Sequence, residues 1–300
     1  MQKPLIFSGS SHQGLAREIS KKSHFKEGKI DIHFFPDKET SVQIQENVKD
    51  RDVFIVQSTA LDPNYFFMEL MIIVDALKRG AAKSITAIIP YFGYTRQDRM
   101  DRPGVPITPK LIANLLTRAG VSRLITLDLH TPQIEGFFDI PIHNLSSSEI
   151  LIPAINKLKL KDPIIVAPDI GGIKIANTFA RKLNCSMAII DKERINASEV
   201  QEHMFIGDVR GKEVIITDDV CSTAGTLVSA AATCKKLGAK RIIAAVGHGL
   251  LISDAIKRIE KSPIELLIAT NSIQESNRLN GSKKLQFFSA AEIIANVIKE

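Results

Sequence analysis

The stretch EVIITDDVCSTAGTLVSAAATCKKLGAKRIIAAVG, residues 213–247, contains a complete strand–turn–helix–strand pattern. Its first and last parts are short, β-branched apolar runs, which are typical of strands that are buried on both faces. Between them, residues 226–239 have apolar side chains at helical spacing, and the glycine near their end predicts the end of a helix. A unit of this kind predicts two parallel strands joined by a helix, and therefore an α/β fold.

The same alternation of strands and helices continues along the chain. A second helix is predicted over residues 68–81, which have the same apolar spacing and the same late glycine. The strands are predicted from short apolar runs at residues 52–58, 84–92, 123–130, 163–169, 187–192, 213–219, 241–248 and 264–270.

Two parts of the chain repeat one another. The segment from Asp52 onward has the same order of strand, turn, helix and strand as residues 213–247, which favours two similar doubly wound domains related by internal duplication. We expect an N-terminal domain over residues 1–145, completed by a C-terminal helix over 288–300, and a C-terminal domain over 146–287.

Composition limits the class of protein. The chain has 300 residues, of which 44% are hydrophobic and 24% are charged, as in ordinary soluble globular proteins. No apolar run approaches the roughly 18–20 residues of a membrane span, and the three cysteines lack metal-ligand spacing, which favours reduced thiols in the cytoplasm. The net charge of +6 comes from dispersed basic residues, so we expect neither a nucleic-acid nor a membrane partner.

Two adjacent acids, Asp218 and Asp219, stand at the end of predicted strand 213–219, where ligands of open α/β sheets bind. The small residues after them can hold a phosphate through backbone N–H groups, hydroxyls and the start of the next helix. These residues are Ser222, Thr223, Ala224, Gly225 and Thr226. The acids suit the cis-diol of a ribose whose 5-phosphate lies in the turn. The alternative is a capped helix start with solvated acids, for which one capping residue would suffice.

Two other stretches combine rings with polar groups. Residues 91–94 supply aromatic rings that could contact a purine base, and Arg96, Gln97 and Asp98 supply donors and acceptors for the base and a polyphosphate. Phe35, Asp37 and Glu39 alternate along the chain, so an extended backbone would project all three to one side, where they could hold an adenine. An exposed polar surface is the alternative for both stretches.

Three further groups could serve metal or phosphate chemistry. Asp128 and His130 share a face at the end of a predicted strand and could ligate a divalent cation. Asp169 ends another strand, just before a tight glycine turn. Lys192 and Arg194 lie two residues apart before a polar stretch, as in a lid that closes on phosphates. A structural His and solvated charges are the alternatives.

Taken together, these motifs resemble the ribose-phosphate pyrophosphokinase (PRPP synthetase) family, which has a type I phosphoribosyltransferase-like fold. The stretch DDVCSTAGT resembles the ribose-5-phosphate loop, and PYFGYTRQDRM, LITLDLH, VAPDIGG and DKER follow the family's order of motifs over nearly the whole chain. Five positions depart from the family's usual residues, namely Lys38 for Gly, Glu135 for Gln, His143 for Asp, Glu193 for a basic residue and Ser222 for Asp.

The resemblance implies a reaction of ATP with ribose 5-phosphate that yields PRPP and AMP. It implies that ATP is bound by the residues named above in segments 35–39 and 96–98, and that Mg²⁺ is held by His130, Asp169 and Asp128. Lys192 and Arg194 would be catalytic, and Arg194 would also bind ribose 5-phosphate together with the acid pair and the turn. The family also implies a homo-oligomer, a hexamer or a smaller assembly.

Two other functions stay open at this point. A PRPP-consuming phosphoribosyltransferase would share the 218–226 loop but would not need the PYFGYTRQDRM and DKER motifs. A non-catalytic regulatory subunit of the synthetase type would explain the serine at position 222 and the histidine at position 143.

Overall fold

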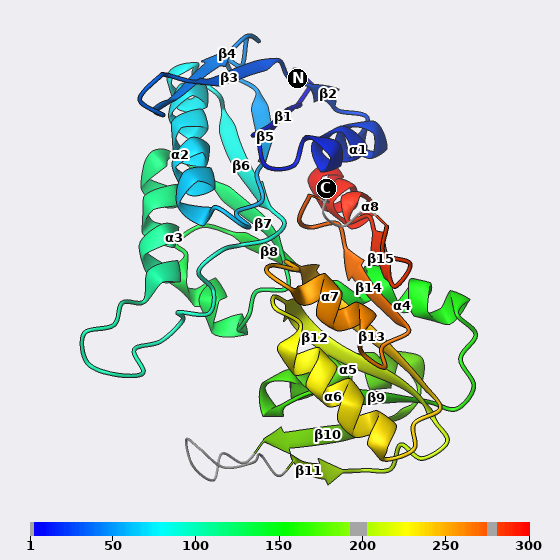
Figure 1. Ribbon diagram of the computed structural model, residues 1–300. Coiled ribbons are helices and arrows are strands. Elements are labelled where there is room, and N and C mark those ends of the chain that lie inside the picture. The colour runs from blue at the N-terminus through cyan, green and yellow to red at the C-terminus, as the bar shows by residue number, and fades with distance from the viewer. Residues whose placement is uncertain (1–2, 193–202, 275–280) are drawn as a thin grey trace. The chain divides into compact units, whose positions relative to one another are not determined.

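The computed structural model describes residues 3–192, 203–274 and 281–300 (Figure 1). The chain divides into two compact units. The first unit comprises Met1–Ser146, Ser272–Gln274 and Ser289–Glu300, and the second comprises Ser147–Asn271 and Glu275–Phe288.

The first unit is built on a fully parallel sheet with the strand order β2-β1-β5-β6-β7-β8. Helices α2 and α3 cover one face of this sheet, and α1 and α8 lie on the other (Figure 1). An antiparallel hairpin, β3–β4, is added beside α2. The strands of the unit are β1 (Leu5–Ser8), β2 (Lys26–Glu27), β3 (Ile30–Phe34), β4 (Thr40–Ile44), β5 (Asp52–Val56), β6 (Ser84–Ile89), β7 (Arg123–Leu127) and β8 (Ile142–Leu145). The helices are α1 (Gln13–Ser23), α2 (Pro63–Arg79), α3 (Thr108–Ala119), η1 (Pro132–Phe137) and α8 (Ala291–Lys299).

The second unit has a seven-stranded sheet with the order β11-β10-β9-β12-β13-β14-β15, in which only β11 is antiparallel. Its strands are β9 (Pro163–Ala167), β10 (Ser186–Lys192), β11 (His203–Ile206), β12 (Glu213–Cys221), β13 (Arg241–Gly249), β14 (Leu266–Thr270) and β15 (Leu285–Phe288). Its helices are α4 (Ser148–Lys157), η2 (Ile170–Gly172), α5 (Ile173–Leu183), α6 (Gly225–Lys236) and α7 (Ala255–Glu260). The predicted α/β class with mainly parallel sheets is confirmed.

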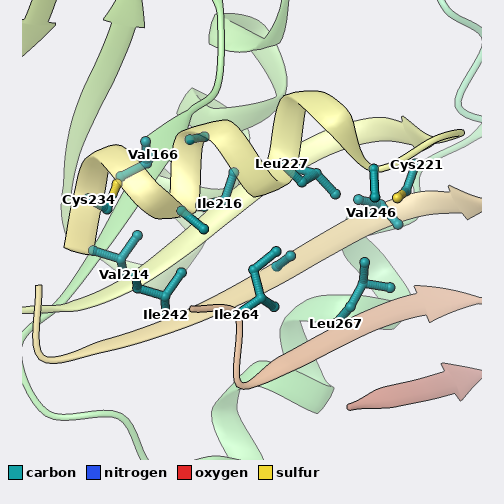
Figure 2. Packing of buried hydrophobic residues seen from close by; sticks show 14 of the residues in the cluster. Val166, Val214, Ile216, Cys221, Leu227, Cys234, Ile242, Val246, Ile264 and Leu267 are labelled. Atoms are coloured by element: carbon teal, nitrogen blue, oxygen red, sulfur yellow. The ribbon is translucent and has the colours of Figure 1, made fainter. Parts of the chain in front are cut away.

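Alternation along β12 explains why its apolar run is nearly continuous. Val214 and Ile216 pack under α6 and α7, while Ile215 packs under α4 and α5. Figure 2 shows Leu227 and Cys234 of α6 lying over Val214 and Ile216. Because both faces are covered by helices, the buried residues 214–217 before the acid pair are three apolar side chains and one threonine, and the charged Glu213 stands only at the half-buried start of the strand.

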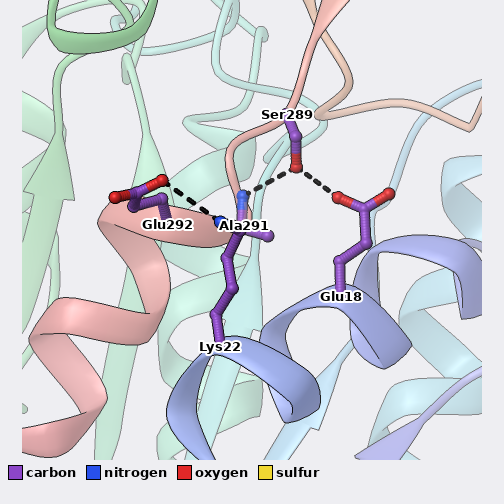
Figure 3. Close-up of polar contacts among 5 residues, drawn as sticks. All are labelled: Glu18, Lys22, Ser289, Ala291 and Glu292. Atoms are coloured by element: carbon purple, nitrogen blue, oxygen red, sulfur yellow. Dashed lines mark hydrogen bonds and ion pairs between the residues drawn. The ribbon is translucent and has the colours of Figure 1, made fainter.

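The last helix of the chain completes the first unit. Its apolar face is buried, and its first turn is joined to α1 by polar contacts (Figure 3). Lys22 Nζ lies 3.1 Å from Glu292 Oε2, and Ser289 Oγ donates to the Glu18 carboxylate while accepting from the N–H of Ala291 at 3.1 Å. Residues at the two ends of the sequence therefore lie in one unit.

A fully buried carboxylate, Glu69 of α2, organises the carboxyl ends of β1 and β5. It accepts hydrogen bonds from Ser10 N and Ser10 Oγ, both at 2.7 Å, from Gln57 Nε2 at 2.6 Å and from the hydroxyl of Tyr65. Burial and the carboxylate raise the pKa of Tyr65 to about 12. A Cβ at Gly9 would lie 2.2 Å from Gln57 Oε1, so this network requires glycine at position 9.

Glu69→Ala is expected to lower the free energy of unfolding by about 3 kcal/mol or more, because the buried Gln57 amide and the partly buried hydrogen bonds from Ser10 and Tyr65 lose their acceptor at once. The matched control is Glu292→Ala, which removes an exposed ion pair and should cost about 1 kcal/mol or less. Urea unfolding followed by circular dichroism measures both variants. Equal losses in the two variants would contradict this role of Glu69.

Candidate active site

The acid pair of the second unit was predicted to end its strand, but β12 continues past it to Cys221. Pairing with β9 stops at Ile216, whereas pairing with β13 continues to Cys221. Beyond Ile216, β12 therefore continues as a strand that is hydrogen-bonded to β13 on one side only. Asp218 and Asp219 are therefore half-buried on a strand that β9 no longer accompanies.

The carboxylates around Asp218 interact with one another electrostatically. Burial, the charge of Asp219, a side-chain hydrogen bond with Asp219 and the charge of Asp169 raise the pKa of Asp218 to about 8. The N–H of Asp219 donates to Asp218 Oδ1 at 2.9 Å, which favours the ionised form but is outweighed. Asp169 caps η2 by accepting from Gly172 N at 3.1 Å. This side of the unit therefore favours a cation or hydrogen-bond donors from a ligand.

The turn after β12 leads directly into α6, whose first residue is Gly225. The N-cap residue, Ala224, has a left-handed backbone with φ of 62°, and no side chain of the turn caps the helix. The left-handed position that glycine would favour is thus Ala224. A Cβ on Gly225 would meet its nearest protein atoms at an ordinary 3.7 Å, so packing within the unit does not require glycine there. The exposed Gly225 leaves the turn open to an approaching ligand.

The backbone carbonyl groups at the end of β12 and in the turn accept hydrogen bonds from the loop after β13 and from α7. Leu251 N donates to Cys221 O and Ile252 N donates to Ser222 O, both at 3.0 Å. Arg258 of α7 places Nη1 3.4 Å from Thr223 O. Arg258 was missed by the sequence analysis because it lies 35 residues after Thr223 and belongs to no motif.

In the first unit, the loop after β6 presents Arg96 and Gln97 at the surface, while Asp98 is half-buried. Thr108 donates to the Gln97 side chain, and Thr131 Oγ1 donates to Asp98 Oδ2 at 2.8 Å. The Asp98 carboxylate thus ties this loop to the one after β7.

The rings expected at this loop divide between core and surface. Phe92 is 2% exposed and packs in the core, so the expectation that its ring is available to a base is wrong. Tyr91 and Tyr94 are half-buried, and Tyr94 stacks on Phe67 with ring centroids 6.0 Å apart.

Residues 35–39 form the turn of the β3–β4 hairpin, so the extended strand considered for Phe35, Asp37 and Glu39 is wrong. The N–H of Phe35 donates to Glu39 O at 2.9 Å, and Glu39 N donates to Asp37 Oδ1 at 3.2 Å. Lys38 has a φ of 74°, which explains why the family's usual glycine suits this position. All residues of the turn are exposed.

The proposed metal ligands belong to different units. Asp128 and His130 follow β7 in the first unit, with Asp128 half-buried and His130 exposed, whereas Asp169 lies in the second unit. Within the part of the chain that the structure describes, no group of three or more His, Cys, Asp or Glu side chains is placed to hold a metal ion.

Of the two predicted catalytic residues, Lys192 ends β10, with its backbone opposite His203, and Arg194 lies outside the described residues.

The structure therefore brings together two sets of predicted residues. In the second unit, Asp169, Asp218 and Asp219 interact electrostatically beside the 222–226 turn. In the first unit, Asp98 joins the 96–98 loop to the turn that carries Asp128 and His130.

Among the described residues, no helix has both the length and the apolar composition that a membrane span needs.

Comparisons with known proteins cover both units. A family model described as the N-terminal domain of ribose phosphate pyrophosphokinase matches residues 4–120, and a phosphoribosyl transferase domain model matches residues 140–270. The ribose-phosphate pyrophosphokinase of Helicobacter pylori (strain J99) is 43% identical to this chain, and the alignment covers 98% of this chain and 92% of that relative. The ribose-phosphate pyrophosphokinase of Campylobacter jejuni is 45% identical, and the alignment covers 98% of this chain and 94% of that relative. The chain belongs to the ribose-phosphate pyrophosphokinase family.

A solved structure supports the same family assignment. The phosphoribosylpyrophosphate synthetase of Mycobacterium smegmatis superposes with a TM-score of 0.93 at 34% identity, covering 99% of this chain and 98% of that one. The similarity to this pyrophosphokinase-family enzyme therefore extends over both units and their connections.

Proposed function

We propose that the protein is a ribose-phosphate diphosphokinase that converts ATP and ribose 5-phosphate to PRPP and AMP. The 1-hydroxyl of ribose attacks the β-phosphorus of ATP, the bond from that phosphorus to the α,β-bridging oxygen breaks, and the hydroxyl proton is released. AMP leaves with the bridging oxygen. Such phosphoryl chemistry depends mainly on positioning and charge stabilisation.

The observation that carries the proposal is the second unit's acid cluster beside an open turn. A phosphate accepts hydrogen bonds from backbone N–H groups at a helix start, and the uncapped first turn of α6 offers such a position at residues 222–226. The carboxylates of Asp218 and Asp219 accept hydrogen bonds from the ribose hydroxyls. Family membership supports this assignment, because the family's name specifies a ribose phosphate and a diphosphoryl transfer.

The residues of the first unit suit ATP. Arg96 and Gln97 are exposed donors on the loop after β6, and the hairpin turn exposes a ring and two carboxylates at Phe35, Asp37 and Glu39. We assign ATP binding to these residues and to Asp98. Lys192 and Arg194 neutralise charge that develops on the transferred group, and Arg194 also contacts ribose 5-phosphate.

The chemistry of the donors fits Mg²⁺. Burial and then the charges of Asp219 and Asp169 raise the pKa of Asp218, and a cation beside these carboxylates would offset the repulsion between them. Mg²⁺ is usually held by one or two carboxylates together with water and substrate phosphates. We assign Mg²⁺ binding to His130, Asp169 and Asp128 for ATP, and to Asp218 and Asp219 beside the ribose. When bound, the ion supplies charge neutralisation for the phosphates.

The decisive experiment incubates the purified protein with ATP, ribose 5-phosphate and Mg²⁺ and separates the products. Label from [α-³²P]ATP should appear in AMP, and label from [γ-³²P]ATP should appear in PRPP, only when ribose 5-phosphate is present. Formation of ADP would instead indicate single phosphoryl transfer. Consumption of added PRPP with a purine base, without AMP release from ATP, would indicate a phosphoribosyltransferase and overturn the proposal.

A further inference from the structure

The turn that follows β7, residues 128–131, is held at three points within the first unit. Asp128 N donates to Leu145 O at 2.9 Å, Leu129 N donates to Asn144 Oδ1 at 3.1 Å, and Thr131 Oγ1 donates to Asp98 Oδ2 at 2.8 Å. The exposed His130 is therefore flanked on both sides by residues with fixed positions.

Asn144 of β8 uses both ends of its amide in this arrangement. Its Oδ1 accepts from Leu129 N, and its Nδ2 donates to Glu135 Oε1 at 2.9 Å. A backbone N–H can only donate and an ionised carboxylate can only accept, so these two partners determine which way the amide points. Neither an aspartate nor an aliphatic side chain could satisfy both partners.

The backbone of the turn needs such support. Asp128 has a φ of 41°, in the left-handed region, which costs an L-residue roughly 1 kcal/mol. Conformations of this kind persist where the surrounding contacts determine them. Leu129 is 8% exposed and packs in the core, and its N–H is the group that Asn144 holds. The Asn144 amide thus links the buried Leu129 to β8, directly after the strained Asp128, whose own N–H donates to Leu145 O.

We propose that Asn144 is a positioning residue for His130 and Asp128, and that Glu135 orients the Asn144 amide. This inference rests on the proposed function, in which those two residues act on the ATP side of the reaction. Partners that orient metal-binding residues are worth about 10–100-fold in affinity or activity. Asn144 itself would touch neither substrate.

A set of three variants separates the orientation of the amide from simple packing. Asn144→Asp keeps an acceptor for Leu129 N but places a second carboxylate against Glu135, so the two repel. Glu135→Gln keeps an acceptor for Asn144 Nδ2 and serves as the neutral control. The double variant, Asn144→Asp with Glu135→Gln, restores a donor–acceptor pair with reversed polarity and should recover the wild-type turn.

Each variant is compared with the wild type in structure, activity, ligand affinity and melting temperature. Hydrogen exchange followed by mass spectrometry reports protection of the peptide that contains Leu129, and steady-state kinetics report KM and kcat for each substrate. Asn144→Asp should lose protection at this peptide, and kcat/KM for ATP should fall about 10-fold or more. The KM for ribose 5-phosphate should change less than twofold. The double variant should regain protection and return to within about threefold of wild type in kcat/KM. Titration calorimetry with a non-hydrolysable ATP analogue and Mg²⁺ should show the same order of affinities.

Several outcomes would overturn the inference. The inference is wrong if Asn144→Asp shows the same exchange protection and kinetics as Glu135→Gln. It is also wrong if the double variant does not regain the protection and kcat/KM of the wild type. An equal loss for both substrates, accompanied by a lower melting temperature, would indicate a structural role only. If wild-type protein lacks the proposed activity, the proposed function fails, and the exchange data still test whether Asn144 holds the turn.

Discussion

Replacing Asp218 with asparagine is expected to lower activity by about 100-fold or more and, in the same protein, to raise thermal stability. The carboxyl group of Asp218 is half-buried beside Asp219 and within the field of Asp169, so its ionisation in the unliganded protein is unfavourable. Asparagine removes this cost but also removes the carboxylate that the ribose site uses. We expect the melting temperature to rise by a few degrees in a scanning calorimeter.

The carboxyl group of Asp218 also makes the stability of the protein depend on pH. The pKa of Asp218 is about 8 in the folded protein, against an ordinary value of 3.8, so the folded state keeps a proton that the unfolded state releases. Stability of the wild-type protein without ligands should therefore fall as the pH rises from about 4 to about 8, with a slope of at most about 1.4 kcal/mol per pH unit. Asp218→Asn should flatten this slope, and added Mg²⁺ should do so in the wild type.

Asp254→Asn provides the matched control for both measurements. Asp254 is an exposed carboxylate of the same unit, paired at the surface with Lys257 at 3.1 Å. Its replacement should leave activity and the pH slope nearly unchanged. If Asp218→Asn lowers the melting temperature or leaves activity unchanged, the idea that the acid pair binds a ligand at a cost in stability is wrong.

Lys192→Ala should decrease kcat by about 100- to 1,000-fold, with KM for either substrate changed less than about threefold. The reason is that charge on the transferred group develops mainly in the transition state, so a cation that neutralises it contributes little to ground-state binding. The backbone of Lys192 ends β10, next to the segment that contains Arg194. Initial rates of AMP release over a range of both substrates provide the measurement.

The control for this variant is Lys174→Ala, which removes an exposed lysine from α5. It should leave both constants unchanged, because surface charges of this kind contribute little. A proportional rise in KM without a change in kcat would show that Lys192 acts in binding only. That result would reject its assignment as a catalytic residue.

Local patterns in the sequence predicted the elements that carry the site. The β-branched run before Asp218 and the helical spacing after Gly225 correspond to β12 and α6, and each of the other predicted strands has its counterpart. Short elements were missed, including β8 and the two-residue β2, because a run of a few residues has too little periodicity to be recognised. The hairpin turn at residues 35–39 was misread, because alternation by itself cannot distinguish a strand from a turn that joins two strands.

The sequence by itself determined the α/β class, the family and the residue types at the ends of the strands, because these depend on periodicity and on motifs that are contiguous in the chain. Only the tertiary structure decided that the pKa of Asp218 is raised, that Glu69 is fully buried among four donors and that Asn144 faces Leu129. Glu69 has partners between 4 and 59 residues away in the sequence, Asn144 contacts a residue 15 away, and Asp218 lies in the field of the distant Asp169 as well as of its neighbour Asp219. Burial and electric field are set by neighbours in space, and no local pattern specifies which distant residues those will be.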